Sequence, residues 1–168
     1  MYLAVDAGTT VVKAALGTAD GSILDTAGCR LVIDAPRDGW CEMNMETVWQ
    51  AVCRVLRQLR EGNASCWPGI EAVGICAQGD GLWPIDENGA PVRPAILWND
   101  TRAASLLDYG ETNRLALKHS SSPLFTGAAP VILRWLKDFE PESYHRTAHA
   151  LHCKDWLSYP KLPTFYLP

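Results

Sequence analysis

No run of apolar residues in the sequence approaches the ~18 that a helix needs to cross a bilayer. The beginning also lacks a basic segment followed by an apolar one, because Asp6 interrupts the first apolar run. We therefore expect no membrane segment, no secretory signal and a cytoplasmic location. Basic residues are outnumbered, 15 against 19 acidic ones, and the net charge of -4 argues against nucleic acid or an anionic membrane as partner. The 168 residues, 48% hydrophobic, are enough for one globular domain.

Closely spaced cysteine pairs are missing as well. None of the six cysteines belongs to a C-x-x-C pair, and structural zinc sites require tight groups of Cys and His. The densest such group is His149, His152 and Cys153, which we interpret as ordinary core and surface residues rather than a metal site. Reduced, buried thiols are the expectation for the cysteines.

Two common nucleotide-binding patterns are absent, namely G-x-x-x-x-G-K-[ST] and G-x-G-x-x-G. What is present is MYLAVDAGTTVVK, in which an apolar run ends at Asp6 and a short turn with one glycine and two threonines follows. Backbone amides in a turn of this kind bind anions, and threonine hydroxyls add donors for phosphate oxygens. Asp6 is a candidate ligand for Mg²⁺, directly or through water, and Lys13 supplies a cation if the second strand folds back along the first.

These features together match what holds the terminal phosphates of a nucleotide. The motif alone leaves a second interpretation open, in which Asp6 and Thr9 only cap their own hairpin turn.

The apolar periodicity predicts a mixed α/β core. We expect an antiparallel meander of three strands, a helix with Asn44 as its N-cap and Gly62 at its end, and then a fully buried strand over 70–77. Two short strands should flank a turn at Asp86–Gly89. The expected ranges are strands at 2–5, 11–16, 22–31, 70–77, 82–85, 95–98 and 148–153, and helices at 45–59, 101–107 and 130–139.

Six blocks occur along the chain in a characteristic order: DAGTTVVK, GWCEMNMETVW, GICAQGDGLWPIDENGAPVRPAILWNDTRA, the pair Thr126-Gly127, ILRWLKDFEPESY and HCKDWLSY. From residue 1 to about Tyr159 this order closely resembles the N-terminal part of the FGGY family of carbohydrate kinases, which includes glycerol, xylulose, erythritol and L-xylulose kinases. The resemblance implies a ribonuclease H-like α/β fold of the actin and hexokinase type, a mixed sheet with flanking helices. It also implies transfer of the γ-phosphoryl group of ATP, with Mg²⁺, to a hydroxyl of a sugar or polyol. Full-length members are often homo-oligomers.

The resemblance assigns roles to two groups of residues. The phosphate and metal group is Asp6, Gly8, Thr9, Thr10 and Lys13, and the substrate group is Gln78, Gly79, Asp80, Trp98, Asn99 and Asp100. A carboxylate such as Asp80 accepts two hydroxyl hydrogen bonds, and an indole such as Trp98 covers the apolar face of a sugar. Other interpretations remain for these residues: Asp80 as a turn residue, Trp98 as a core aromatic, and Asp100 with Arg102 as a structural ion pair.

Position 79 differs among members of the family. Glycerol kinases carry arginine there and xylulokinases methionine, so Gly79 leaves more room and brings Gln-Gly-Asp-Gly nearest to the erythritol and L-xylulose kinase type.

Family members are much longer than this sequence, and the resemblance places the catalytic aspartate beyond residue 168. After the KDWL block the family continues with Leu-Thr-Gly, whereas PKLPTFYLP stands here. We therefore expect a partial kinase domain over 1–159 and a non-native or disordered tail over 160–168, as a frameshift, premature stop or gene-model error would produce. The chain is then either a kinase fragment that is inactive alone, or a non-catalytic sugar-binding or pseudogene product. An actin-like ATPase of another kind ranks last, since it would lack the WNDTRA block.

Overall fold

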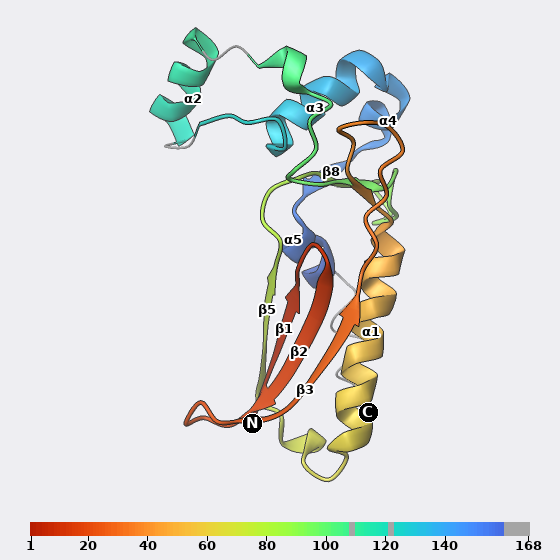
Figure 1. The fold of residues 1–168 in the computed structure, drawn as a ribbon, viewed down its shortest axis with the longest axis vertical. Helices are drawn as coiled ribbons and strands as arrows, with labels where there is room; N and C mark the ends of the chain where they lie inside the picture. The colour runs from red at the N-terminus through yellow and green to blue at the C-terminus, as the bar shows by residue number, and fades with distance from the viewer. Residues whose placement is uncertain (108–109, 121–122, 160–168) are drawn as a thin grey trace. The chain divides into compact units, whose positions relative to one another are not determined.

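The computed structural model describes residues 1–107, 110–120 and 123–159, so the tail expected over 160–168 lies outside the described residues (Figure 1). The chain divides into two compact units. The first comprises Met1–Ile33, Met45–Gln78 and the segment from Cys153 onward, and the second comprises Asp34–Asn44 and Gly79–His152.

The first unit is built on a four-stranded sheet of order β3-β2-β1-β5. Its strands are β1 (Tyr2–Ala7), β2 (Val11–Gly17), β3 (Ile23–Arg30) and β5 (Ala72–Ala77). The first three form the predicted antiparallel meander, and β5 runs parallel to β1. Apolar residues alternate along β1 and β2, which places Leu3, Val5, Val12 and Leu16 on one buried face.

Helix α1 (Met45–Gly62) covers that buried face and lies alongside the sheet in Figure 1. Its apolar stripe is buried against β2 and β3, and the helix ends at Gly62 as predicted. The short helix α5 (Cys153–Ser158) packs beside β5 and buries Cys153, Trp156 and Leu157, while a 3₁₀-helix, η1 (Trp67–Gly69), leads into β5.

The prediction of a fully buried strand over 70–77 is wrong. In β5, Ala72, Gly74 and Cys76 are exposed and the residues between them are half-buried. The apolar run misled because Ala, Gly and Cys are small enough to lie on an open sheet face at little cost, and a continuous apolar run carries no periodicity that shows which face is covered.

The second unit has its own core, in which Leu82, Ile96, Ile132 and Leu136 are fully buried. Two small antiparallel sheets pair β4 (Glu42–Met43) with β7 (Ala95–Ile96) and β6 (Trp83–Ile85) with β8 (His149–Leu151). The predicted turn at Asp86–Gly89 is confirmed by its backbone hydrogen bonds, and the predicted helix at 130–139 by α3 (Ala129–Phe139).

The prediction of a helix over 101–107 is wrong, since only a 3₁₀-helix, η2 (Ala104–Leu106), forms there. The backbone N–H of Thr101 donates to Gly39 O at 2.8 Å, and that of Arg102 donates to a carboxylate oxygen of Asp100, so both amides have partners outside a helix. The sequence pattern did not predict α2 (Glu111–Ser120) or α4 (Pro141–Arg146).

All six cysteines are free thiols, with Cys53 and Cys153 buried and Cys76 exposed. In the described part of the chain, no group of three or more His, Cys, Asp or Glu side chains is placed to hold a metal ion. Nor does any helix within the described ranges have both the length and the apolar character to cross a bilayer.

Candidate functional site

The turn between β1 and β2 carries the residues of the predicted phosphate and metal group. Asp6 lies directly opposite Lys13 in the antiparallel pair, so the second strand does fold back along the first and the two charges share the exposed sheet face. The N–H of Gly8 donates to Val11 O at 3.1 Å and closes the turn. A Cβ at Gly8 would come within 3.1 Å of the same carbonyl oxygen, so the turn favours glycine here.

Gln78 joins this turn from the neighbouring strand. Because β5 runs parallel to β1, both strands end at the same edge, and Gln78 N donates to Ala7 O at 2.9 Å. The Thr9 hydroxyl donates to Gln78 Oε1 at 3.2 Å. Gln78 Nε2 is buried, and within the described residues it has no hydrogen-bond acceptor. A buried amide without an acceptor is costly, so this N–H group is well suited to a ligand oxygen.

The sheet face around Asp6 and Lys13 is hollowed into an open concavity of about 450 Å³. Its floor is formed mainly by small residues such as Ala4, Ala15 and Gly28. Cys76 lies at its edge, where burial and then the Asp6 carboxylate raise the pKa of its thiol. The thiol is therefore held protonated beside the two charged residues.

The donor set of the turn fits Mg²⁺. This ion is commonly held by one or two carboxylates, with phosphate oxygens and water completing its octahedron. Asp6 supplies an exposed carboxylate at the end of β1, and Thr9 and Thr10 follow it in the turn. Asp6 is the residue in this turn that would hold the ion.

In the second unit, Asp80 has an unusual backbone conformation. Its φ is +50°, in the left-handed region, and it is exposed. Glycine adopts such angles freely, whereas other residues there are uncommon and cost about 1–3 kcal/mol in the strained cases. A carboxylate held at such a position is a candidate for function.

Two glycines bring the Asp80 loop against the segment that carries Trp98. Gly81 has a φ of +76°, and a Cβ on it would lie 2.6 Å from Ile96 O and 3.2 Å from Trp98 N. Gly81 N donates to Gly127 O at 2.9 Å. A Cβ on Gly127 would overlap the carbonyl group of Trp98. Three backbone segments therefore meet without an intervening side chain, and they hold Asp80 and the 47% exposed Trp98 close together.

The structure does not place Asp100 where a substrate can reach it. Its side chain is 1% exposed, and both carboxylate oxygens accept hydrogen bonds from the protein. Oδ1 accepts from the backbone N and from Nε of Arg102, and Oδ2 accepts from Arg102 Nη2 at 2.8 Å and from Cys41 N at 2.6 Å. Of the two interpretations from the sequence, these contacts correspond to the ion pair. Asn99, by contrast, is exposed.

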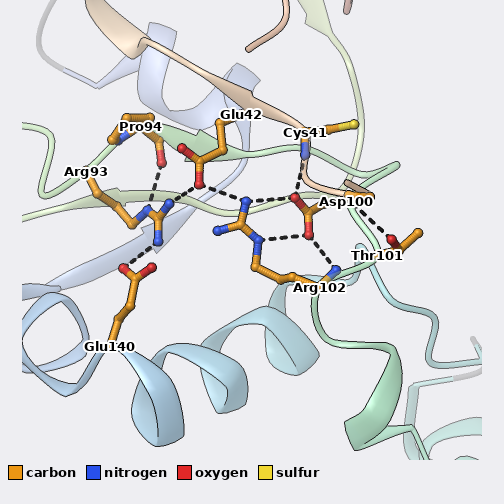
Figure 2. Close-up of polar contacts among 9 residues, drawn as sticks. Cys41, Glu42, Arg93, Pro94, Asp100, Thr101, Arg102 and Glu140 are labelled. Atoms are coloured by element: carbon orange, nitrogen blue, oxygen red, sulfur yellow. Dashed lines mark hydrogen bonds and ion pairs between the residues drawn. The ribbon is translucent and has the colours of Figure 1, made fainter. Parts of the chain in front are cut away.

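The ion pair belongs to a larger buried network (Figure 2). Glu42 Oε1 accepts from Arg102 Nη2 at 2.7 Å and also from Arg93, whose Nη1 donates to Glu140 at 2.5 Å. The Arg102 guanidinium carbon lies 3.7 Å from the ring centroid of Trp40 and 5.2 Å from that of Trp135. Sequence reasoning assigned no role to Glu42, Arg93 or Gly127, although each lies in one of the six blocks, because their partners lie far away along the chain.

Comparison with known proteins gives consistent results. The model of the FGGY family of carbohydrate kinases, N-terminal domain, matches residues 1–162. A probable L-xylulose kinase from Pasteurella multocida is 33% identical over 161 residues, which are 94% of this chain and 33% of that protein. An erythritol kinase from Brucella abortus is 30% identical over 160 residues, 94% of this chain and 31% of that protein.

The crystal structure of a xyloylose kinase from Brucella ovis matches with a TM-score of 0.87 at 27% identity, covering 94% of this chain and 33% of that one. The mixed α/β fold of the actin and hexokinase type expected from the sequence is confirmed by this likeness. The chain spans about a third of the length of the curated relatives it matches.

Proposed function

Because the chain belongs to the FGGY family of carbohydrate kinases, we propose that it forms part of an enzyme that transfers the γ-phosphoryl group of ATP to a hydroxyl of a sugar or polyol. In this proposal the first unit binds the phosphates and the second unit contributes side chains that bind the acceptor. The observation that carries it is the hydrogen bond from Thr9 to Gln78, which links the phosphate turn to the first of the predicted acceptor residues.

Each residue of the phosphate turn makes a different kind of interaction with the bound phosphates in this proposal. The backbone N–H groups of Thr9 and Thr10 and the Thr10 hydroxyl donate to phosphate oxygens, while the Thr9 hydroxyl stays on Gln78 Oε1 and Lys13 offsets the negative charge. Asp6 would hold Mg²⁺, directly or through water, and the ion would supply further charge neutralisation there. Positioning and charge stabilisation account for most of the catalysis in phosphoryl transfer, so these are the contributions expected of this turn.

The acceptor residues recognise hydroxyl groups and C–H faces. Asp80 accepts hydrogen bonds from two hydroxyls, Asn99 donates and accepts at its amide, and Trp98 covers an apolar face. Gln78 Nε2, which lacks an acceptor within the described residues, donates to an oxygen of the substrate. Asp100 is buried in its ion pair with Arg102 and does not touch the acceptor. The names of the relatives suggest L-xylulose and erythritol as the first compounds to test.

The proposal is tested by binding, since binding does not require the complete catalytic machinery. Titrate the 168-residue chain by calorimetry with L-xylulose, xylitol, erythritol and glycerol, and separately with MgATP. We expect one of the first three to bind more tightly than glycerol, and Asp6→Asn to weaken MgATP binding without affecting the sugar. Asp138→Asn is the matched control, because the one partner of the Asp138 side chain within the described ranges is the exposed Arg134 on α3. The absence of binding for every sugar and polyol would contradict the assignment of the acceptor residues.

A non-catalytic sugar-binding role is the second candidate, and the same binding residues support it. It is distinguished by adding MgATP to the sugar-bound chain: in a kinase the two ligands bind together, so each should bind at its own dissociation constant or more tightly when the other is present.

A further inference from the structure

A charged network with little access to water includes Asp100, which directly follows Trp98 and Asn99 in the chain. The Arg102 side chain is 1% exposed, and that of Arg93 is 9% exposed. Asp100, which follows Asn99 in the chain, receives a fork of two hydrogen bonds from the Arg102 guanidinium, at 2.9 and 2.8 Å (Figure 2). The chain is therefore fixed in direction immediately after the two proposed acceptor residues.

Arg102 itself is fixed from several sides. Its Nη2 is shared between Asp100 and Glu42, and its plane lies over the ring of Trp40. Its Nη1 is buried and has no hydrogen-bond partner among the described residues. Burial of a guanidinium is costly unless its geometry is well satisfied. The planar fork on a carboxylate and the stacking on an indole are contacts that arginine makes and lysine does not.

The other side of the same segment is fixed by backbone contact. The Gly127 Cα lies so close to the Trp98 carbonyl that no Cβ can be added without movement of one of the two chains. Trp98 is thus held between the Gly127 backbone and the Asp100–Arg102 fork, while its side chain stays 47% exposed.

We infer that Arg102 is a positioning residue for the acceptor site, acting through Asp100 to hold Trp98 and Asn99 against the Gly127 backbone. The inference rests on the proposed function, since it assumes that Trp98 and Asn99 bind the sugar or polyol. It adds that acceptor affinity depends on a side chain that the acceptor never contacts. The effect is one of geometry, because small misplacements of binding groups are costly in preorganised sites.

The test compares Arg102→Lys with Arg134→Lys. Both keep the positive charge, but among the residues that the structure describes Arg134 pairs with Asp138 alone, on α3, and its side chain is 67% exposed. Folding is checked by circular dichroism and thermal unfolding. Two readouts follow: the dissociation constant for the tightest-binding sugar or polyol of the panel, and the indole N–H signal of Trp98 in a ¹H–¹⁵N spectrum, assigned by its loss in Trp98→Phe.

We expect Arg102→Lys to remain folded, to shift the Trp98 signal in the absence of ligand and to weaken sugar binding about tenfold, the effect of losing about one charged hydrogen bond. Arg134→Lys should match the wild type in both readouts. Gly127→Ala should also shift the Trp98 signal and weaken binding, because it moves the segment from its other side. If Arg102→Lys does not fold, Asp100→Asn carries the same expectation, since an amide offers only one acceptor atom to the fork.

Three results separate the inference from the function on which it rests. A folded Arg102→Lys with unchanged Trp98 signal and unchanged sugar affinity overturns the positioning role and leaves the acceptor site standing. A lower melting temperature with both readouts unchanged also overturns it, because it shows a structural role only. Failure of the wild type to bind any sugar or polyol of the panel overturns the proposed acceptor site and the inference together.

Discussion

The backbone conformation of Asp80 is one that glycine adopts more readily than aspartate. Its φ of +50° suits glycine, and glycines stand on both sides of it, yet a carboxylate occupies the position. Aspartate is one of the non-glycine residues that adopt left-handed angles more readily than most, and here it adds a carboxylate that glycine would not provide. In the proposed function this contribution is the pair of acceptor atoms offered to the sugar hydroxyls.

Replacing Asp80 should separate affinity from stability. We expect Asp80→Gly to weaken sugar binding tenfold or more, because a charged hydrogen-bond acceptor is lost, while the thermal midpoint stays the same or rises by about 2–4 °C. Asp80→Asn should also weaken binding without lowering the midpoint, since Asn tolerates left-handed angles. Calorimetric titration and thermal unfolding of both variants check this. A fall in midpoint with unchanged affinity would mean that Asp80 serves the turn alone.

The Cys153 thiol should impose a pH dependence on stability. Burial, followed by the charge of Asp155, raises its pKa far above the ordinary value of 9.0. The unfolded chain therefore loses this proton first. Below pH 9 the Cys153 thiol makes its full contribution to stability, because it is protonated in both the folded and the unfolded chain. Above pH 9 the free energy of unfolding should fall by about 1.4 kcal/mol per pH unit.

Urea unfolding of the wild type and Cys153→Ala between pH 7 and 10 measures this contribution. The difference in unfolding free energy between the two should shrink as the pH rises above 9. Cys66→Ala, which replaces a half-buried cysteine in the same unit, is the control for removal of a thiol. Parallel pH profiles for wild type and Cys153→Ala would contradict the prediction.

Elements whose pattern is local were predictable from the sequence. The alternation in β1 and β2 gave their buried face, and the stripe along α1 gave its packing side, because period and burial coincide there. The half-exposed state of β5 was not predictable, since it depends on what covers the sheet and not on the strand itself. The failure at 101–107 has a different cause: a long-range hydrogen bond to Gly39 and a local one to the Asp100 carboxylate outweigh a weak helical pattern.

Two glycines should respond oppositely to alanine. Gly74 lies within β5, and no described heavy atom stands within 4 Å of where its Cβ would be. Gly74→Ala should raise the free energy of unfolding by roughly 0.5–1 kcal/mol by restricting the unfolded chain. Gly81→Ala should lower it by about 1–3 kcal/mol, because its φ of +76° and the Ile96 carbonyl at 2.6 Å oppose a Cβ.

Shifted urea midpoints with unchanged slopes would establish that both effects are changes in stability rather than in the surface exposed on unfolding. Equal shifts in the same direction would mean that the backbone of the Gly81 turn relaxes freely.

At the scale of the molecule, the sequence predicted where individual residues lie better than which distant residues they contact. Asp6, Lys13 and Gln78 occupy positions that local order and strand pairing dictate. The Asp100 contacts could not be read from the sequence, because the same WNDTR stretch suits a ligand contact or an internal ion pair. The partners that decide between them, Cys41 and Glu42, come from a distant segment.

The 168 residues alone should not phosphorylate any sugar or polyol. The resemblance assigns the general base to a position outside them, and loss of a general base typically costs ~10²–10⁴ in rate. Incubate the purified chain with MgATP and the panel, with the Brucella abortus erythritol kinase and erythritol as positive control. Turnover near ~1 s⁻¹, at the low end for kinases, would overturn the prediction.

The Gly79–Gly81 loop also indicates which position can mutate during evolution to alter the set of acceptors in the proposed function. A side chain at Gly81 is opposed by its φ of +76° and by the nearby Ile96 carbonyl oxygen. A Cβ at Gly79, in contrast, would meet no described heavy atom within 4 Å. A single codon change at position 79 can therefore install a new side chain beside the acceptor residues while the rest of the loop keeps its shape. In the proposed function, acceptor preference can therefore change at position 79, whereas a side chain at Gly81 would meet the Ile96 carbonyl oxygen.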